Sequence, residues 1–188
     1  MRLLGGLLNV GLRASLIAML IRILRAGAAD PRYAAKGIGP RALAIMPLAS
    51  LAVPLAWLRH RRGRYPVWMD DLYLSIFALD LAGNVFDLYD SYEHFDLLPH
   101  AHGTGAATVL SAWALGVPML SGIGVATVVH VALEVQEYAS DIAFGYRNVR
   151  GTWDVIGDLS AGLVGTAAYA APYVLLVRGR GLEPAPIV

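Results

Sequence analysis

The sequence predicts an all-α membrane protein, a single domain over residues 1–188 built as a polytopic bundle of about six transmembrane helices. Two observations lead to this prediction. Hydrophobic residues make up 57% of the chain and charged residues only 15%, whereas soluble domains contain about 25% charged residues. The hydrophobic residues also fall in continuous blocks of roughly 20 residues, the length that an α-helix needs to cross a bilayer. The lipid bilayer is therefore the expected partner of most of the surface.

Six hydrophobic segments can be drawn along the chain. They cover residues 3–24, 42–58, 68–89, 104–120, 122–141 and 154–177. The first segment is the least regular, because Arg2, Asn9 and Arg13 share one helical face. It either crosses the membrane or lies in the membrane interface, in which case five spans remain.

The basic residues predict which ends of the membrane spans face the cytoplasm. Arg13, Arg22 and Arg25 occupy positions that are normally uncharged in a signal peptide, so we expect the first segment to be retained. The densest basic cluster follows the second segment and comprises Arg59, Arg61, Arg62 and Arg64. The positive-inside rule places this cluster in the cytoplasm, and with six spans both termini are then cytoplasmic.

Composition also excludes several classes of function. A net charge of +1 without a long basic stripe argues against binding of nucleic acid, whose backbone attracts clustered Lys and Arg. The chain contains no cysteine, which excludes disulfides, thiolate metal sites and cysteine nucleophiles. The sequence also lacks a glycine-rich phosphate loop, a serine triad motif and a dinucleotide fingerprint.

Acidic residues recur at helical spacing in three segments. The stripe in segment 68–89 consists of Asp80, Asn84 and Asp87, and the stripe in segment 122–141 consists of His130, Glu134, Glu137 and Asp141. Segment 154–177 begins with Asp154 and Asp158 and continues with Gly162 and Gly165, small residues that let a neighbouring helix approach closely. Because successive spans alternate in direction, we expect all three stripes at the same end of the bundle.

The connection between the third and fourth segments adds ionisable groups at that end. They are Asp90, Glu93, His94, Asp96, His100 and His102. An ionisable group near the membrane centre costs at least ~2.5 kcal/mol, and the nearest basic residues, Arg147 and Arg150, cannot neutralise so many acids. A divalent cation or shared protons would balance the charge. Mixed His and carboxylate ligands suit Zn²⁺, Mn²⁺ or Fe.

Many of these residues also fit ordinary structural roles. Asp90, Glu93 and Asp96 fit solvated loop residues as well as site residues, and His102 fits a surface residue. His130, alone on an apolar helix, fits a hydrogen-bonded packing residue better than a ligand. For the acids in segments 122–141 and 154–177, the alternative to a metal site is a network of protonated carboxyls.

Three stretches resemble the YjdF-like family of bacterial integral membrane proteins and, more loosely, the VanZ-like group. They are Tyr89-Asp90 followed by His94-Phe95, the acids Glu134 and Glu137 in LEVQEY, and Asp154, Asp158, Gly162 and Gly165 in TWDVIGDLSAGLVG. A run of the form GN-x-x-x-LYD, followed by an aspartate and a histidine, falls on Gly83-Asn84, Leu88-Tyr89-Asp90, Asp96 and His100, and favours His100 over His94. The resemblance implies a multi-pass helical bundle in the bacterial inner membrane, and it supports the site without indicating a reaction.

The leading hypothesis is a metal-dependent enzyme that acts on a lipid-like or amphipathic substrate. Its expected ligands for one or two divalent metal ions are His100, Glu134, Glu137, Asp154, Asp158 and His94, and its expected catalytic groups, which orient ligands or accept a proton, are Asp87 and Asp90. Two alternatives stay open. One is a proton or cation pathway through Asp80, Asp87, Glu134 and Asp158. The other is a structural or accessory subunit that meets a membrane-protein partner or a second copy of the chain.

Overall fold

The computed structural model describes residues 2–27, 30–60 and 64–179, and every regular element in these ranges is a helix, which confirms the all-α prediction. The helices are α1 (Arg2–Ala26), α2 (Ile38–His60), α3 (Val67–Val85), α4 (Leu88–Ser91), α5 (Leu97–Leu115), α6 (Met119–Phe144) and α7 (Thr152–Gly179). Arg61 and Arg62 of the basic cluster lie outside the described residues. The contacts divide the chain into two compact units, Met1–Glu93 and His94–Val188. The single domain over 1–188 stays a prediction.

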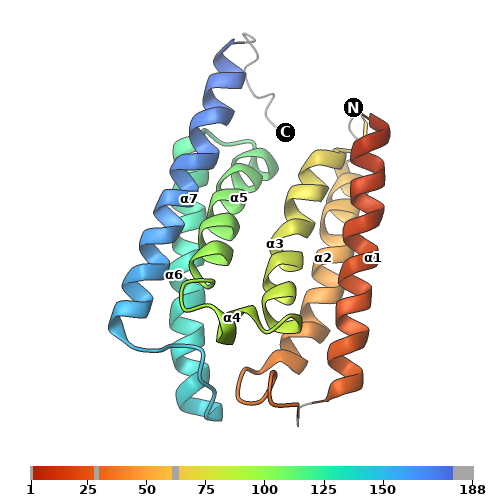
Figure 1. Ribbon diagram of the computed structural model, residues 1–188. Coiled ribbons are helices and arrows are strands. Elements are labelled where there is room, and N and C mark those ends of the chain that lie inside the picture. Colours follow the sequence, from red (N-terminus) through yellow and green to blue (C-terminus); the bar gives the residue numbers. More distant parts are fainter. Residues whose placement is uncertain (1, 28–29, 61–63, 180–188) are drawn as a thin grey trace. The chain divides into compact units, whose positions relative to one another are not determined.

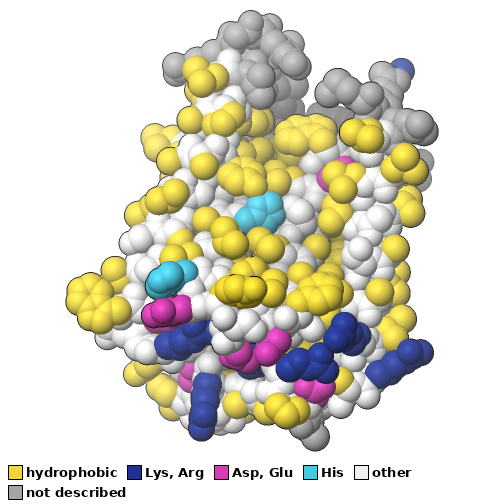
Figure 2. All heavy atoms as spheres, viewed as in Figure 1, with side chains coloured by type: hydrophobic (Ala, Val, Ile, Leu, Met, Phe, Trp, Pro, Cys, Tyr) yellow, Lys and Arg dark blue, Asp and Glu magenta, His cyan; other side chains and the backbone are white. Residues whose placement is uncertain are grey.

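Three helices are long and apolar enough to cross a membrane. They are Leu4–Ala26 within α1, Arg41–Leu58 within α2, and α6. Large hydrophobic side chains face outward on these helices, for example Leu4 and Val128, which are 75% and 69% exposed. Figure 2 shows hydrophobic side chains over much of the drawn face of each unit. Such a surface suits contact with lipid, so the structure supports a membrane protein, while the count of six spans stays a prediction.

In the first unit, α1 and α2 pack on α3 (Figure 1). One face of α1 supplies Leu16, Leu20 and Ile23, all buried and spaced at i, i+4 and i+7. They pack in one core with Leu74 and Leu81 of α3, which are fully buried. The helical period therefore gives α1 a core face and a hydrophobic face directed outward.

A polar network continues the core face of α1, and it centres on Asp70 of α3, which is fully buried. Asp70 Oδ2 accepts hydrogen bonds from Asn9 Nδ2 at 2.8 Å, from Arg13 Nη2 at 2.5 Å and from the Tyr65 hydroxyl at 2.6 Å. Asn9 Nδ2 also donates to Asp71 Oδ1 at 2.8 Å. Burial and the hydrogen bond to Asp70 raise the pKa of Tyr65, so its phenol stays protonated and donates. Asn9 and Arg13, two of the polar residues that suggested an interfacial first helix, thus bind α3.

Helix boundaries differ from the prediction at two places that matter for the site. α3 ends at Val85, and Asp87 adopts a left-handed conformation with φ of 58°, which aspartate tolerates better than most residues. Asp87 therefore does not continue the stripe of Asp80 and Asn84 on α3, which corrects that part of the prediction. α5 begins at Leu97 rather than at residue 104, so His100 lies on a helix instead of in a loop.

In the second unit, α5 packs against both α6 and α7 (Figure 1). Glycines make the closest contacts, as the sequence predicted for Gly162 and Gly165. A Cβ atom added at Gly165 would collide with the carbonyl oxygen of Ala101, and one added at Gly122 would lie 2.7 Å from that of Thr108. The backbones of α5, α6 and α7 therefore approach more closely than any larger residue would allow.

We expect the substitution Gly165→Ala to destabilise the second unit, because the new methyl group has no room against Ala101. Overpacking of this kind costs about 1–3 kcal/mol or more. The matched control is Gly157→Ala on the same helix, where the added Cβ would lie 3.5 Å from Leu97 Cδ2, an ordinary contact. Thermal unfolding in detergent measures both, and equal midpoints for the two variants would contradict the close packing.

The substitution Arg13→Gln should destabilise the first unit by about 3 kcal/mol, because it leaves the buried Asp70 carboxylate without its cation. Arg25→Gln is the control, since Arg25 is exposed near the end of the same helix. Chemical denaturation followed by circular dichroism compares the two. A similar small effect for both variants would mean that the Arg13 ion pair contributes little.

Candidate metal centre

The second unit brings together histidines and carboxylates from three helices. Asp96 and His100 lie at the start of α5 at spacing i, i+4, and His130 and Glu134 lie in the middle of α6 at the same spacing. Asp158 of α7 completes the cluster. The i, i+4 spacing puts each pair on one face of its helix, because an α-helix repeats every 3.6 residues. His130, Glu134 and Asp158 are buried, and Asp96 and His100 are partly buried.

Three ligand atoms in this cluster form a compact triangle. His100 Nδ1 and His130 Nε2 are within hydrogen-bonding distance at 2.9 Å, and Glu134 Oε1 lies 3.4 Å from each of these nitrogens. Ligand atoms about 2.0–2.1 Å from a Zn²⁺ ion in tetrahedral geometry are separated by about 3.3–3.4 Å. Two of the three sides thus match one face of a metal coordination sphere, the third side is shorter, and the three residues form a group that could hold a metal ion.

The Glu134 carboxylate supports the same interpretation. Its Oε1 atom is buried and has no hydrogen-bond partner among the described residues. A buried carboxylate oxygen without a donor costs free energy, since the charge has lost its water. The ion pairs of Glu134 in the described part of the chain are with His100 and His130. A cation bound between these three side chains would supply the missing positive charge.

A second group shares His100 with the first. The Nε2 atom of His100 lies 3.4 Å from Asp96 Oδ1 and 3.8 Å from Asp158 Oδ1, and the three residues form another group that could hold a metal. The Nε2 atom of His100 therefore faces two carboxylates, whereas its Nδ1 atom faces Glu134 and His130. If Nδ1 binds a metal, the Nε2–H group points to Asp96 and Asp158, the usual arrangement by which a carboxylate orients a histidine ligand.

His130 is held in place by its other ring nitrogen. Its Nδ1 atom lies 3.0 Å from the hydroxyl of Thr104. When Nδ1–H donates to this hydroxyl, Nε2 carries the lone pair that a metal needs. Gly162 leaves room for the ring, because a Cβ atom there would collide with His130 Nδ1. The close approach of α7 is therefore part of the site.

The structure brings together three of the six predicted metal ligands, His100, Glu134 and Asp158. The other three lie outside both groups: Glu137 is half-buried one turn further along α6, Asp154 accepts a hydrogen bond from Arg150 N at 2.8 Å, and His94 is exposed. The two predicted catalytic residues belong to the first unit. Asp87 precedes α4, and Asp90 forms an ion pair with Lys36 at 2.5 Å. Their catalytic role stays a prediction.

Two residues of the cluster were not predicted as site residues. Asp96 fitted a solvated loop, and His130 fitted a packing residue, yet each lies in one of the two groups. The spacing of Asp96 to His100 and of His130 to Glu134 was the available signal. It was hidden for Asp96, because the helix that contains His100 begins before the hydrophobic segment does.

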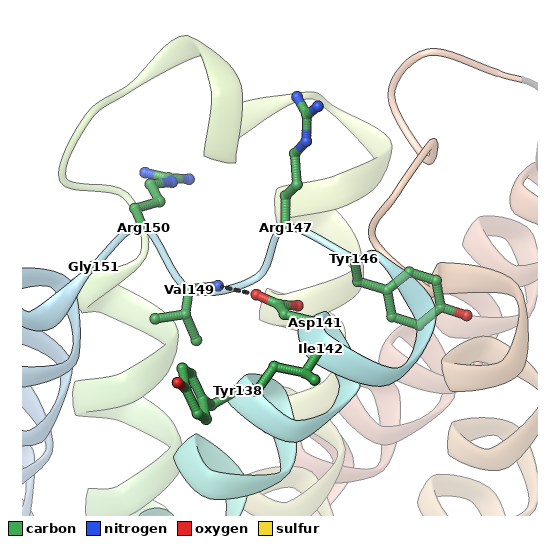
Figure 3. Close-up of a pocket in the computed structure, with 8 residues that line it drawn as sticks. All are labelled: Tyr138, Asp141, Ile142, Tyr146, Arg147, Val149, Arg150 and Gly151. Carbon is green, nitrogen blue, oxygen red and sulfur yellow. Dashed lines mark hydrogen bonds between the residues drawn. The ribbon is translucent and has the colours of Figure 1, made fainter.

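A pocket lies elsewhere in the second unit, where α6 ends and the loop to α7 begins (Figure 3). It has a volume of about 540 Å³, and its lining contains none of the residues of the two groups that could hold a metal. The candidate metal centre is therefore identified by its side-chain geometry and not by this pocket.

Comparison of the chain with protein-family models, with curated proteins and with solved structures finds no match.

The substitution Gly162→Ala should move the His130 ring, because the added methyl group would collide with Nδ1. We expect a change in the His130 imidazole resonances in ¹⁵N NMR spectra of histidine-labelled protein in detergent. Gly124→Ala on α6 is the control, since nothing lies within 4 Å of its added Cβ. Unchanged His130 resonances in folded Gly162→Ala protein would contradict the described packing.

Proposed function

We propose that this chain is a multi-pass protein of the bacterial inner membrane that binds a divalent metal ion through His100, His130 and Glu134. The observation that carries the proposal is the triangle of their ligand atoms, with sides of 2.9, 3.4 and 3.4 Å. Two histidines and one glutamate form a ligand set known from catalytic zinc sites, in which further positions stay open for water or substrate. The ligand set also suits Mn²⁺ or Fe.

We further propose that the bound metal serves an enzyme rather than a structural site. Structural zinc sites usually have four protein ligands, whereas three ligands leave room for chemistry. When bound, a divalent ion can polarise a carbonyl or phosphoryl group and activate water. Asp96 and Asp158, on the far side of His100, would hold its Nε2 proton and keep Nδ1 directed at the metal. Asp96 lies at the start of α5, and this position favours contact between its carboxylate and water.

The substrate class follows from the surroundings of the site. Glu134 and His130 lie on α6, one of the three helices that could cross a membrane. A substrate that reaches these residues from the bilayer would be lipid-like or amphipathic. The resemblance to YjdF-like and VanZ-like membrane proteins fits this location, and we carry it as part of the proposal. A fold of six spans is the topology that we propose for it.

A second candidate function is a proton or cation pathway, and one observation favours it. Among the described residues, Asp70 is buried beside Asp71 with one arginine as its ion-pair partner, and Asp70 Oδ1 has no hydrogen-bond partner. Asp70 and Asp71 are therefore buried polar groups in the first unit. A core of hydrophobic side chains alone would block a pathway for protons or cations there. Metal content separates the two functions, because a pathway for protons does not need a bound metal.

The double substitution Glu134→Gln with Asp158→Asn should abolish stoichiometric metal in the purified protein, because the amides keep the side-chain shape but lose the negative charges. Elemental analysis of detergent-purified protein measures the metal, and circular dichroism checks the fold. The matched control is Glu137→Gln with Asp154→Asn, which changes one acid on each of the same two helices.

The control pair distinguishes the ligand set found in the structure from the rest of the predicted set. Metal retained by the control and lost by Glu134→Gln with Asp158→Asn supports the proposed centre. Metal lost only in the control would move the site toward Glu137 and Asp154. Wild-type protein without metal, after purification and incubation with Zn²⁺, Mn²⁺ and Fe²⁺, would contradict the proposal and favour the proton pathway.

A further inference from the structure

The pocket at the end of α6 combines a hydrophobic surface with basic side chains. It is lined by Tyr138, Asp141, Ile142, Tyr146, Arg147, Val149, Arg150 and Gly151. In Figure 3, Tyr138 and Ile142 lie on one side of the loop, and the side chains of Arg147 and Arg150 extend from the opposite side. The lining thus changes from apolar to cationic across the loop.

Asp141 fixes this loop on the end of α6. Its two carboxylate oxygens accept hydrogen bonds from the backbone N–H groups of Asn148 and Val149 at 2.8–3.0 Å, and from Asn148 Nδ2 at 2.7 Å. A carboxylate that accepts several N–H bonds holds the backbone in one arrangement. These hydrogen bonds therefore hold the loop that carries Arg147 and Arg150 in one arrangement at the end of α6. The lining contains two cations and one anion, which leaves a net charge of +1.

A hydrophobic stripe on α6 leads to the pocket. Val131, Val135, Tyr138 and Ile142 recur at i, i+4, i+7 and i+11 and are 44–71% exposed. This spacing puts them on one face of the helix. Because α6 is long and apolar enough to cross a membrane, we expect lipid to cover this face. The basic loop then follows the stripe where the hydrophobic span ends, at the level of lipid headgroups.

We propose that this pocket binds an anionic phospholipid, with an acyl chain along the α6 stripe and the phosphate beside Arg147 and Arg150. Arginine is suited to phosphate, because its guanidinium group donates two parallel hydrogen bonds. The apolar lining would accommodate the glycerol and upper acyl region, and a volume of about 540 Å³ lies within the range of small-molecule sites. The lipid site uses neither metal-binding group, so it stands whether or not the chain binds a metal.

The test is a titration of the full-length protein, purified in neutral detergent, with phosphatidylglycerol or phosphatidylcholine, followed by native mass spectrometry. We expect phosphatidylglycerol to bind at least about fivefold more tightly than phosphatidylcholine, the effect of one basic contact at a membrane surface. Arg147→Gln with Arg150→Gln should remove this preference. The control with Arg25→Gln, an exposed arginine near the end of α1, should keep it.

Two further arms distinguish a bound phospholipid from free phosphate and from a purely electrostatic contact. Inorganic phosphate at the same concentration should not displace phosphatidylglycerol, since it lacks the acyl chain, and Ile142→Ser should weaken binding of both lipids. Thermal unfolding of each variant verifies that it is folded. The proposal is overturned if the preference is absent, if it survives the double arginine substitution, if Arg25→Gln loses it equally, or if inorganic phosphate displaces the lipid.

Discussion

The buried carboxylate of Glu134 is the constraint on which the candidate site in the second unit depends. Its Oε1 atom has two imidazole nitrogens at 3.4 Å but no hydrogen-bond donor among the described residues. Such a group needs a positive partner, because removal of water from a charge is costly. A metal ion at the centre of the triangle would meet this need. The two histidines, which come from different helices, also lie within hydrogen-bonding distance of each other at 2.9 Å. The proposed metal centre rests on the triangle of ligand atoms together with this electrostatic requirement.

Close backbone packing makes that arrangement attainable. Gly162 makes room for the His130 ring, and Gly165 lets α7 contact α5 at Ala101. The first unit treats its buried acid differently, because Arg13, Asn9 and Tyr65 all donate to one oxygen of Asp70. In the first unit, protein donors therefore satisfy one oxygen of the buried acid, whereas Asp70 Oδ1, like Glu134 Oε1, has no hydrogen-bond partner among the described residues. In the second unit, a bound cation would supply a partner for the Glu134 oxygen.

Much of the fold could be predicted, because membrane helices are hydrophobic along most of their length. The helix assignment and the close approach at Gly162 and Gly165 followed from composition and spacing. The residues at which α3 ends and α5 begins did not follow from composition and spacing. Asp87 turns the chain through a left-handed conformation that hydrophobicity does not reveal, and α5 begins in a polar stretch. The site was therefore predicted in part, with Asp96 left open between a loop residue and a site residue and His130 interpreted as a packing residue.

The most direct test of the central claim is X-ray absorption spectroscopy at the metal edge of protein loaded with Zn²⁺. We predict two imidazole nitrogens and carboxylate oxygen at about 2.0–2.2 Å, with the imidazole scattering reduced when His130 is replaced by alanine. A sphere of oxygen ligands without imidazole, or a spectrum unchanged by His130→Ala, would contradict a centre built on His100, His130 and Glu134.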